Sequence, residues 1–184
     1  MRVITGIARG RKLVTPDGID VRPTTEKVKE GIFSSIQFEI ENAQVLDLFA
    51  GSGQMGIEAL SRGASRAVFV DSSVKSVKCV NENLRNTGLY RQAEVISRDS
   101  YDYIRLTAQK FDIIILDPPY RYGHIHRLLP LAEKKLNDGG FIICEYEKES
   151  ETPSAPENMV LKKTYRYGKI NVSVFVKPAE VDGE

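Results

Sequence analysis

Short apolar runs alternate with amphipathic stretches through the middle of the chain. The apolar runs have the length and composition of strands and cover residues 43–49, 66–71, 93–97, 111–117 and 141–147. The stretches between them repeat apolar positions at helical spacing and cover residues 54–63, 73–88, 99–109 and 124–140. Strands and helices that alternate in this way predict a parallel sheet with helices on both faces.

Both ends of the chain depart from this alternation. Residues 159–177 predict two strands that turn at Tyr167–Lys169 with no helix between them, so an antiparallel hairpin closes the sheet. Residues 1–15 alternate and turn at Pro16–Gly18, which predicts a small N-terminal hairpin or arm. Residues 22–36 predict an amphipathic helix that begins near Thr24 or Thr25. The predicted fold is a Rossmann-like α/β domain with an antiparallel C-terminal strand.

The composition is that of one globular domain with a small appendage. The 184 residues are 41% hydrophobic and 28% charged. We expect an N-terminal arm over residues 1–20, the main domain over 21–178 and a tail over 179–184. The N-terminus is too polar for a signal peptide, no apolar run approaches the roughly 18 residues that span a bilayer, and Cys79 and Cys144 have the character of reduced core thiols. A cytoplasmic monomer is expected.

The formal net charge of +1 hides an uneven distribution. Basic residues without any acid occur in the first 15 positions (Arg2, Arg9, Arg11, Lys12) and again near the end (Lys162, Lys163, Arg166, Lys169, Lys177). Basic ends around an acidic body are typical of a nucleic-acid-binding surface. Lysine and arginine also protect the exposed edges of sheets from aggregation, so charge alone leaves both interpretations open.

A glycine-rich stretch follows the first predicted strand of the alternating region. Gly51, Gly53 and Gly56 have the G-x-G-x-x-G spacing of a dinucleotide-binding turn. Acids stand at the ends of four successive strands: Asp47, Asp71, Asp99 and Asp117. Since ligands of open parallel sheets bind beyond the carboxyl ends of the strands, these acids are candidate ligand contacts.

The positions of the acids indicate which ligand the glycines serve. Asp71 lies 20 residues after Gly51, where it can accept hydrogen bonds from ribose hydroxyls. Asp47 would repel a pyrophosphate but suits a positive ammonium group, and Asp99 can accept an adenine amino proton. Adenine, ribose and a cationic aminoacyl tail together describe S-adenosylmethionine. For any one acid taken alone, a structural role such as a helix N-cap for Asp71 or Asp99 is favoured. The four acids taken together favour ligand contact.

The tetrapeptide Asp117-Pro118-Pro119-Tyr120 is the sharpest chemical signal. Two prolines remove backbone donors, so an aspartate and a free carbonyl can accept the two protons of an amino group. Tyr120 offers a flat face on which a base can stack. The structural alternative is a tight turn after a buried strand. His124 and His126 follow, and their spacing predicts no metal site; they either line an RNA entrance or begin a helix.

The segments RPTTEKVKEGIF and LDLFAGSGQMGIEALSRGA, the DPPY tetrapeptide and Tyr167-Gly168 together resemble the RsmD family of class I S-adenosylmethionine-dependent methyltransferases, from Arg2 to about Lys177. The resemblance implies a seven-stranded sheet and methyl transfer to the N2 amino group of a guanine in small-subunit (16S) ribosomal RNA, guanine 966 in that RNA's usual numbering. The implied cofactor contacts are Asp47, Phe49, Gly51, Gly53, Asp71 and Asp99, and the implied catalytic residues are Asp117, Pro118, Pro119 and Tyr120. Our candidates for RNA contact are Arg2, Arg9, Arg11, Lys12 and Arg22.

Three other functions compete with this one. A DNA adenine-N6 or cytosine-N4 methyltransferase also uses the DPPY tetrapeptide, but this chain has no large recognition insert. A nicotinamide-dependent oxidoreductase would explain the glycines but not Asp47. A non-catalytic RNA-binding or assembly factor would have no need of the amino-group acceptor at Asp117.

Overall fold

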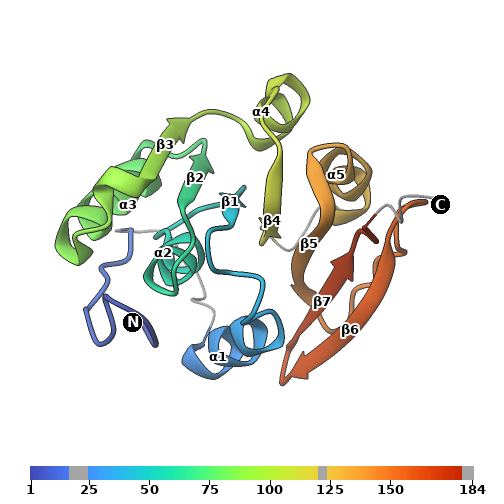
Figure 1. The fold of residues 1–184 in the computed structure, drawn as a ribbon, viewed down its shortest axis with the longest axis horizontal. Helices are drawn as coiled ribbons and strands as arrows, with labels where there is room; N and C mark the ends of the chain where they lie inside the picture. Colours follow the sequence, from blue (N-terminus) through green and yellow to red (C-terminus); the bar gives the residue numbers. More distant parts are fainter. Residues whose placement is uncertain (17–24, 120–123, 180–184) are drawn as a thin grey trace.

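The computed structural model describes residues 1–16, 25–119 and 124–179 (Figure 1). The described strands form one sheet of seven, in the order β3-β2-β1-β4-β5-β7-β6. The strands are β1 (Gln44–Asp47), β2 (Arg66–Asp71), β3 (Ala93–Ser97), β4 (Phe111–Leu116), β5 (Leu136–Glu147), β6 (Val160–Tyr167) and β7 (Ile170–Val176). The helices are α1 (Glu26–Ser35), α2 (Gln54–Ser61), α3 (Val74–Thr87), α4 (Ser100–Leu106) and α5 (His124–Glu133), with a short 3-10 turn at Tyr90–Gln92.

The strand directions confirm the predicted sheet. Strands β1 to β5 pair only in parallel with one another, whereas β7 lies antiparallel to both β5 and β6. The final hairpin turns at Gly168, whose φ of 57° belongs to the left-handed region that favours glycine. The chain therefore has the predicted Rossmann-like α/β architecture with an antiparallel C-terminal strand.

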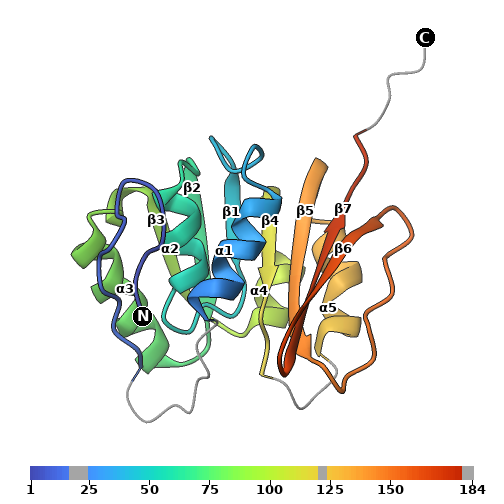
Figure 2. The same cartoon turned by 90° about the horizontal axis from the view of Figure 1, so that it is seen from below.

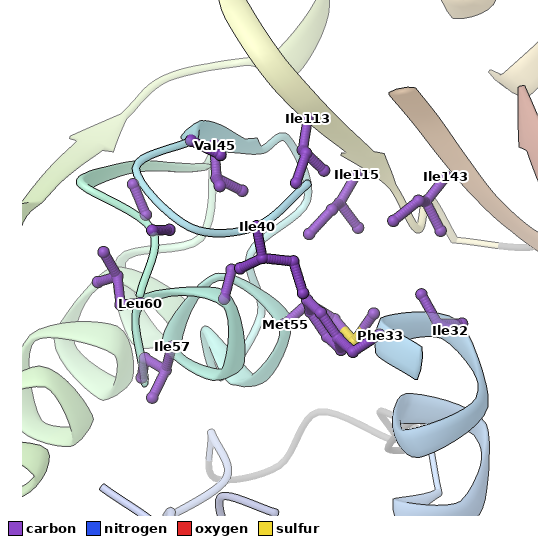
Figure 3. Close-up of a cluster of buried hydrophobic side chains, with 14 of the residues drawn as sticks. Ile32, Phe33, Ile40, Val45, Met55, Ile57, Leu60, Ile113, Ile115 and Ile143 are labelled. Carbon is purple, nitrogen blue, oxygen red and sulfur yellow. The ribbon is translucent and has the colours of Figure 1, made fainter. Parts of the chain in front are cut away.

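Helices cover both faces of the sheet, as the alternating pattern predicts. Helices α1, α2 and α3 lie on one face, and α4 and α5 lie on the other (Figure 1). Successive residues of a strand point to opposite faces, so Ile113 and Ile115 pack in one buried cluster while Ile114 and Leu116 pack in the other. Figure 3 shows the first cluster, in which side chains from α1, α2 and the central strands meet.

The boundary between α5 and β5 differs from the prediction. A helix was expected over residues 124–140, but α5 ends at Glu133 and β5 begins at Leu136. Leu136 pairs with Phe111, and the Phe111 N–H donates to the Lys135 carbonyl at 2.9 Å. The backbone of these residues therefore finds its partners in β4, because pairing across the sheet prevails over local helix preference.

The N-terminal segment, residues 1–16, folds back on itself as a hairpin-like ribbon that lies on α1, α2 and α3. The Val3 N–H donates to the Arg11 carbonyl and the Leu13 N–H to the Met1 carbonyl, both at 3.0 Å. One isolated antiparallel bridge joins Arg2 to Lys12. Most anchors are buried side chains of the helices: Glu58 accepts from the N–H groups of Ile4 and Thr5 at 2.8 and 3.0 Å, and Asn83 accepts from Val14. The predicted arm is thus a docked ribbon over the residues described, while the turn expected at Asp17–Gly18 lies outside them.

Cys79 and Cys144 are both buried in the core and form no disulfide with each other. Burial raises the pKa of the Cys144 thiol far above its usual range. None of the described helices combines the length and apolar character needed to cross a bilayer.

Candidate functional site

The candidate site lies where the strand order reverses. Strand β1 pairs with β2 on one side and with β4 on the other, so the chain leaves β1 in one direction and later returns on the opposite side. In open parallel sheets, ligands bind at the carboxyl edge of this switch point. Asp47 is the last residue of β1, and Asp117 directly follows β4.

The glycine-rich loop between β1 and α2 needs its glycines for two different reasons. Gly51 and Gly53 have φ values of 55° and 76°, which other residues rarely adopt. A Cβ on Gly51 would meet no atom within 4 Å, so this part of the loop faces open space. A Cβ on Gly56 would lie 2.3 Å from the Phe69 ring, so the third glycine allows α2 to pack on β2. Only the first part of the motif is therefore available to a ligand.

Asp47 caps the helix that follows the loop. Its side chain is 2% exposed, and its Oδ2 accepts from the Gly56 N–H at 3.0 Å, in the first turn of α2. The N-cap residue, Gly53, has no side chain to do so. Burial raises the pKa of Asp47 to about 7, with a smaller contribution from the charge of Asp71, although the bond from Gly56 opposes the rise. A cation placed beside Asp47 would restore the charged form.

Asp71 and Asp99 each organise the local backbone. The two carboxylate oxygens of Asp71 accept from the Gly51 N–H at 2.9 Å and the Ser73 N–H at 2.8 Å, so Asp71 holds the glycine loop against the end of β2. Asp99 is exposed, and its Oδ1 caps α4 by accepting from Tyr101 and Asp102. The N-cap alternative is thus confirmed for Asp99, whereas the cap of α3 is Ser73. Neither role prevents a ligand contact.

Asp117 stands in an acidic environment at the end of β4. Its side chain is half-buried, Pro118 is buried and Pro119 is exposed, while Tyr120 lies outside the described residues. Burial, the charge of Glu145 and the charge of Asp47 all hold the pKa of Asp117 well above its usual range. The structure therefore brings together Asp47 and Asp117, which the sequence separates by 70 positions.

A cavity of about 240 Å³ opens beside the two prolines. Its lining comes from the end of β4, the start of α5 and the end of β5 with the loop after it. The lining residues are Pro118, Pro119, His124, Ile125, His126, Glu145, Tyr146, Glu147, Ser150, Glu151 and Pro153.

His124 joins α5 to α4 as well as lining this cavity. Its Nδ1 lies 2.9 Å from the Tyr101 hydroxyl, and its ring centroid lies 6.2 Å from that of Phe49. The guanidinium of Arg127 lies over the Tyr101 ring, 4.9 Å from its centroid. Phe49, a predicted cofactor contact, is half-buried in this aromatic group. Among the described residues, no group of three or more His, Cys, Asp or Glu side chains is arranged to hold a metal ion.

Glu145 is the site residue that sequence analysis did not single out. It is 4% exposed and lies in the buried part of β5, where its neighbours are apolar. A carboxylate within an apolar strand, near the carboxyl end of that strand, could have indicated this residue. Acidic side chains are rarely buried unless they are paired or functional.

The candidates for RNA contact do not share one location. Arg2 forms an ion pair with Glu26 at 3.0 Å. Arg9 and Arg11 are exposed where the N-terminal ribbon turns back, next to Ser61 at the end of α2. Helix α2 starts at the glycine loop, beyond the carboxyl end of β1, and runs back along the sheet. Its last turn therefore lies toward the opposite end of the strands from Asp117, which follows the carboxyl end of β4. Lys12 is exposed in the returning half of the ribbon, and Arg22 lies outside the described residues.

Comparison with known proteins agrees with this geometry. Residues 1–176 match the family described as "Conserved hypothetical protein 95". "Putative rRNA methyltransferase YlbH" of Bacillus subtilis is 39% identical over 182 residues, which cover 96% of this chain and 99% of that protein. "Ribosomal RNA small subunit methyltransferase D" of Escherichia coli K12 is 32% identical over 186 residues, which cover all of this chain and 93% of the relative. The chain belongs to the RsmD-like methyltransferase family.

Solved structures extend the similarity to the fold of RsmD-like methyltransferases. "Putative methyltransferase yhhF" from Escherichia coli superposes with a TM-score of 0.88 at 34% identity and covers 98% of this chain and 99% of its own. The structure of SMU.776, described as a putative methyltransferase complexed with SAH, has a TM-score of 0.67 at 17% identity over 78% of this chain and 49% of its own. At that identity the second comparison supports the fold alone.

Membership of the RsmD-like family confirms the predicted family and cofactor class. The family is one of S-adenosylmethionine-dependent methyltransferases. The nicotinamide-dependent oxidoreductase is thereby excluded as an interpretation of the glycine-rich loop. The individual cofactor, catalytic and RNA contacts assigned from the sequence stay predictions.

Proposed function

We propose that this chain transfers a methyl group from S-adenosylmethionine to the exocyclic N2 amino group of a guanine in small-subunit (16S) ribosomal RNA. The observation that carries the proposal is the position of Asp117 and Pro118 beside the glycine loop of β1, at the switch point of the sheet. The RsmD relative of Escherichia coli, which is named as a small-subunit ribosomal RNA methyltransferase, supports the choice of RNA.

The residues around the loop fit the cofactor's groups. Open space at Gly51 and the first turn of α2 can admit the aminoacyl part of the cofactor. Asp47 would face its ammonium group, Asp71 the ribose and Asp99 the adenine. The raised pKa of Asp47 supports this assignment, since a neighbouring cation would relieve the free energy that burial of its charge requires. Phe49 and Gly53 would complete the contact surface.

Asp117 and Pro118 would make the N2 amino group of the guanine more nucleophilic. The lone pair of a guanine N2 is delocalised into the ring, so the nitrogen is a poor nucleophile. Hydrogen bonds from its two N–H groups to the Asp117 carboxylate and the Pro118 carbonyl favour a pyramidal nitrogen with an available lone pair. Bound S-adenosylmethionine would supply a sulfonium methyl, with the nitrogen–carbon bond forming as the sulfur–carbon bond breaks and S-adenosylhomocysteine leaves. The proton lost from the nitrogen would pass to the Asp117 carboxylate that accepts its hydrogen bond. Positioning and electrostatics account for the acceleration, without a covalent intermediate on the protein.

The direct test is Asp117→Ala. We expect methyl transfer to be lost while cofactor binding is largely kept, measured by a tritium-methyl assay on 16S RNA and small-subunit particles and by calorimetry with S-adenosylhomocysteine. The exposed acid Glu149 provides the matched control, Glu149→Gln, which should leave both unchanged.

Three results would oppose the proposal. Equal loss of binding and transfer in Asp117→Ala would make Asp117 a structural residue. Transfer to DNA oligonucleotides but not to RNA would favour the DNA amino-methyltransferase alternative, and binding of RNA without any transfer would favour the non-catalytic alternative.

A further inference from the structure

Asp117, directly after β4, lies beside Glu145 of the neighbouring strand β5. In the parallel pair of β4 and β5, Ile115 is opposite Ile143 and Leu116 is opposite Cys144. If this register is continued by one residue, Asp117 falls opposite Glu145. Ile115 and Ile143 belong to one buried cluster, and Leu116 and Cys144 belong to the other. Alternation therefore directs both carboxyl side chains to the same face, about 4.8 Å apart between strands.

Burial of a second carboxyl group at this position needs a reason. Glu145 is 4% exposed, and its partner on β7 is the buried Val172. Its charge is close enough to act on Asp117, and two neighbouring carboxylates repel each other. An apolar residue would pack here without that repulsion, so the pair is the kind of strained electrostatic arrangement that marks functional sites.

The edge of guanine that carries N2 matches this pair. Guanine presents two neighbouring donors there, the N1–H and the N2 amino group. Adenine and cytosine present a ring nitrogen lone pair beside their amino group instead. Two carboxyl groups in a row can accept from the two guanine donors, whereas a carboxylate facing a lone pair is repelled and left without a hydrogen bond.

We propose that Glu145 accepts a hydrogen bond from N1–H of the target guanine while Asp117 accepts from N2, so that Glu145 selects guanine among the amino-bearing bases. The assignment rests on the proposed function. Glu145 lines the cavity beside Pro118 and Pro119, which is where a base in contact with Asp117 would extend. The DPPY tetrapeptide would then accept the amino group of any of several bases, and Glu145 would select guanine from among them.

The test uses RNA substrates that carry 2,6-diaminopurine in place of the target guanine. This base keeps the 2-amino group but has a lone pair at N1. The unmodified protein should methylate guanine with a kcat/KM about 10- to 100-fold above that for diaminopurine, the range of one good base-edge contact. In Glu145→Gln, whose amide can donate to N1, that ratio should fall by about tenfold or more, with an unchanged dissociation constant for S-adenosylhomocysteine. Glu149→Gln should keep the ratio of the unmodified protein.

The outcomes separate the two proposals. If the unmodified protein transfers no methyl group to guanine in any of these RNAs, the proposed function fails. If it methylates guanine and diaminopurine equally well, or if Glu145→Gln keeps the original ratio, the function stands and the role of Glu145 is overturned. The comparison of the two bases by the unmodified protein needs no variant, so it decides the matter even where Glu145→Gln does not fold.

Discussion

Three of the four acids at the strand ends accept hydrogen bonds from the local backbone. Asp47 caps α2, Asp71 joins the glycine loop to the start of α3, and Asp99 caps α4. A ligand contact by the same carboxylates would add to these bonds rather than replace them. Substitutions at these positions therefore change both the local backbone and the proposed ligand contacts, and the experiments have to separate the two.

Asp71→Ala should weaken cofactor binding chiefly. The variant loses the proposed charged acceptor for the ribose, together with the bonds to Gly51 of the loop and to Ser73 at the start of α3. We therefore expect a dissociation constant for S-adenosylhomocysteine about 10- to 100-fold higher, since a hydrogen bond to a charged group contributes about 1.5–3 kcal/mol. Calorimetry measures the change, and Asp102→Asn on the exposed side of α4 serves as control. An unchanged dissociation constant would refute the ribose contact.

Asp47 should make stability depend on pH in a predictable direction. The pKa of about 7 in the folded protein exceeds the ordinary carboxyl value of about 3.9, so the folded state binds more protons than the unfolded state between these pH values. The free energy of unfolding therefore falls as pH rises through this window. In Asp47→Asn this group no longer titrates, so the variant does not lose stability in this window. The free energy of unfolding of the variant minus that of the natural protein should therefore rise by about 3 kcal/mol between pH 5 and pH 8.

Urea unfolding at several pH values measures this difference. Asp102→Asn provides the control, because its side chain is exposed at the surface. If the free energies of unfolding of Asp47→Asn and the natural protein differ by the same amount at every pH, the raised pKa assigned to Asp47 is contradicted.

Among the elements, the N-terminal ribbon depends on a buried ion pair. Lys29 of α1 and Glu58 of α2 are both 0% exposed, with Lys29 Nζ 3.8 Å from Glu58 Oε2. Lys29 also donates to the Arg2 carbonyl at 2.8 Å, and Arg62 pairs with Glu58 at 2.8 Å. Burial lowers the pKa of Lys29, although the charge of Glu58 opposes the shift. One carboxylate thus connects α1, α2 and the ribbon.

Glu58→Ala should lower the free energy of unfolding by about 3–5 kcal/mol, because it leaves the Lys29 ammonium buried without its partner. The double variant Lys29→Met with Glu58→Leu should recover a large part of the loss, since an apolar pair of similar size avoids the buried charges. Urea unfolding measures both, and the exposed Glu30→Ala in α1 is the control. A single variant as stable as the control would show that the ribbon does not depend on Glu58.

The limits of element prediction are clearest at β5. Its first residues, Leu136 to Gly140, continue the helical pattern of α5 in sequence, but they pair with β4 and contact the end of β7. The Gly139 N–H donates to the Lys177 carbonyl and the Lys177 N–H to the Gly140 carbonyl, both at 2.9 Å. Partners so distant along the chain leave no local signal. By contrast, α3 was predicted nearly to the residue, because Ser73 and Gly88 are local caps at its two ends.

Across the whole molecule, the two basic ends of the chain lie apart. The N-terminal ribbon lies on the side of α2 and α3, whereas β6, which carries Lys162, Lys163 and Arg166, forms the far edge of the sheet (Figure 2). The edge position of β6 favours the protective role of its cations. The exposed ribbon residues Arg9, Arg11 and Lys12 are the stronger candidates for RNA contact.

A salt titration separates these roles. Replacing Arg9, Arg11 and Lys12 by serine should weaken RNA binding and reduce the slope of log K against log salt by about 2, at about 0.7 per phosphate contact. Replacing Lys162, Lys163 and Arg166 by serine is the matched control and should leave the slope unchanged. An unchanged slope in the ribbon variant would show that its cations only solvate the surface.

The sequence by itself determined the succession of strands and helices along the chain, the closing hairpin, the glycine-rich loop and the acids at the strand ends. These features depend on the spacing of apolar and polar residues, on helix caps and on glycine conformations, all of which involve near neighbours in the chain. Only the tertiary structure decided that Glu145 stands beside Asp117, that Glu58 holds the N-terminal ribbon, and that Gly56 serves packing rather than a ligand. Each of these depends on which strands and helices become neighbours, and burial then sets the free energy of the charges that meet there.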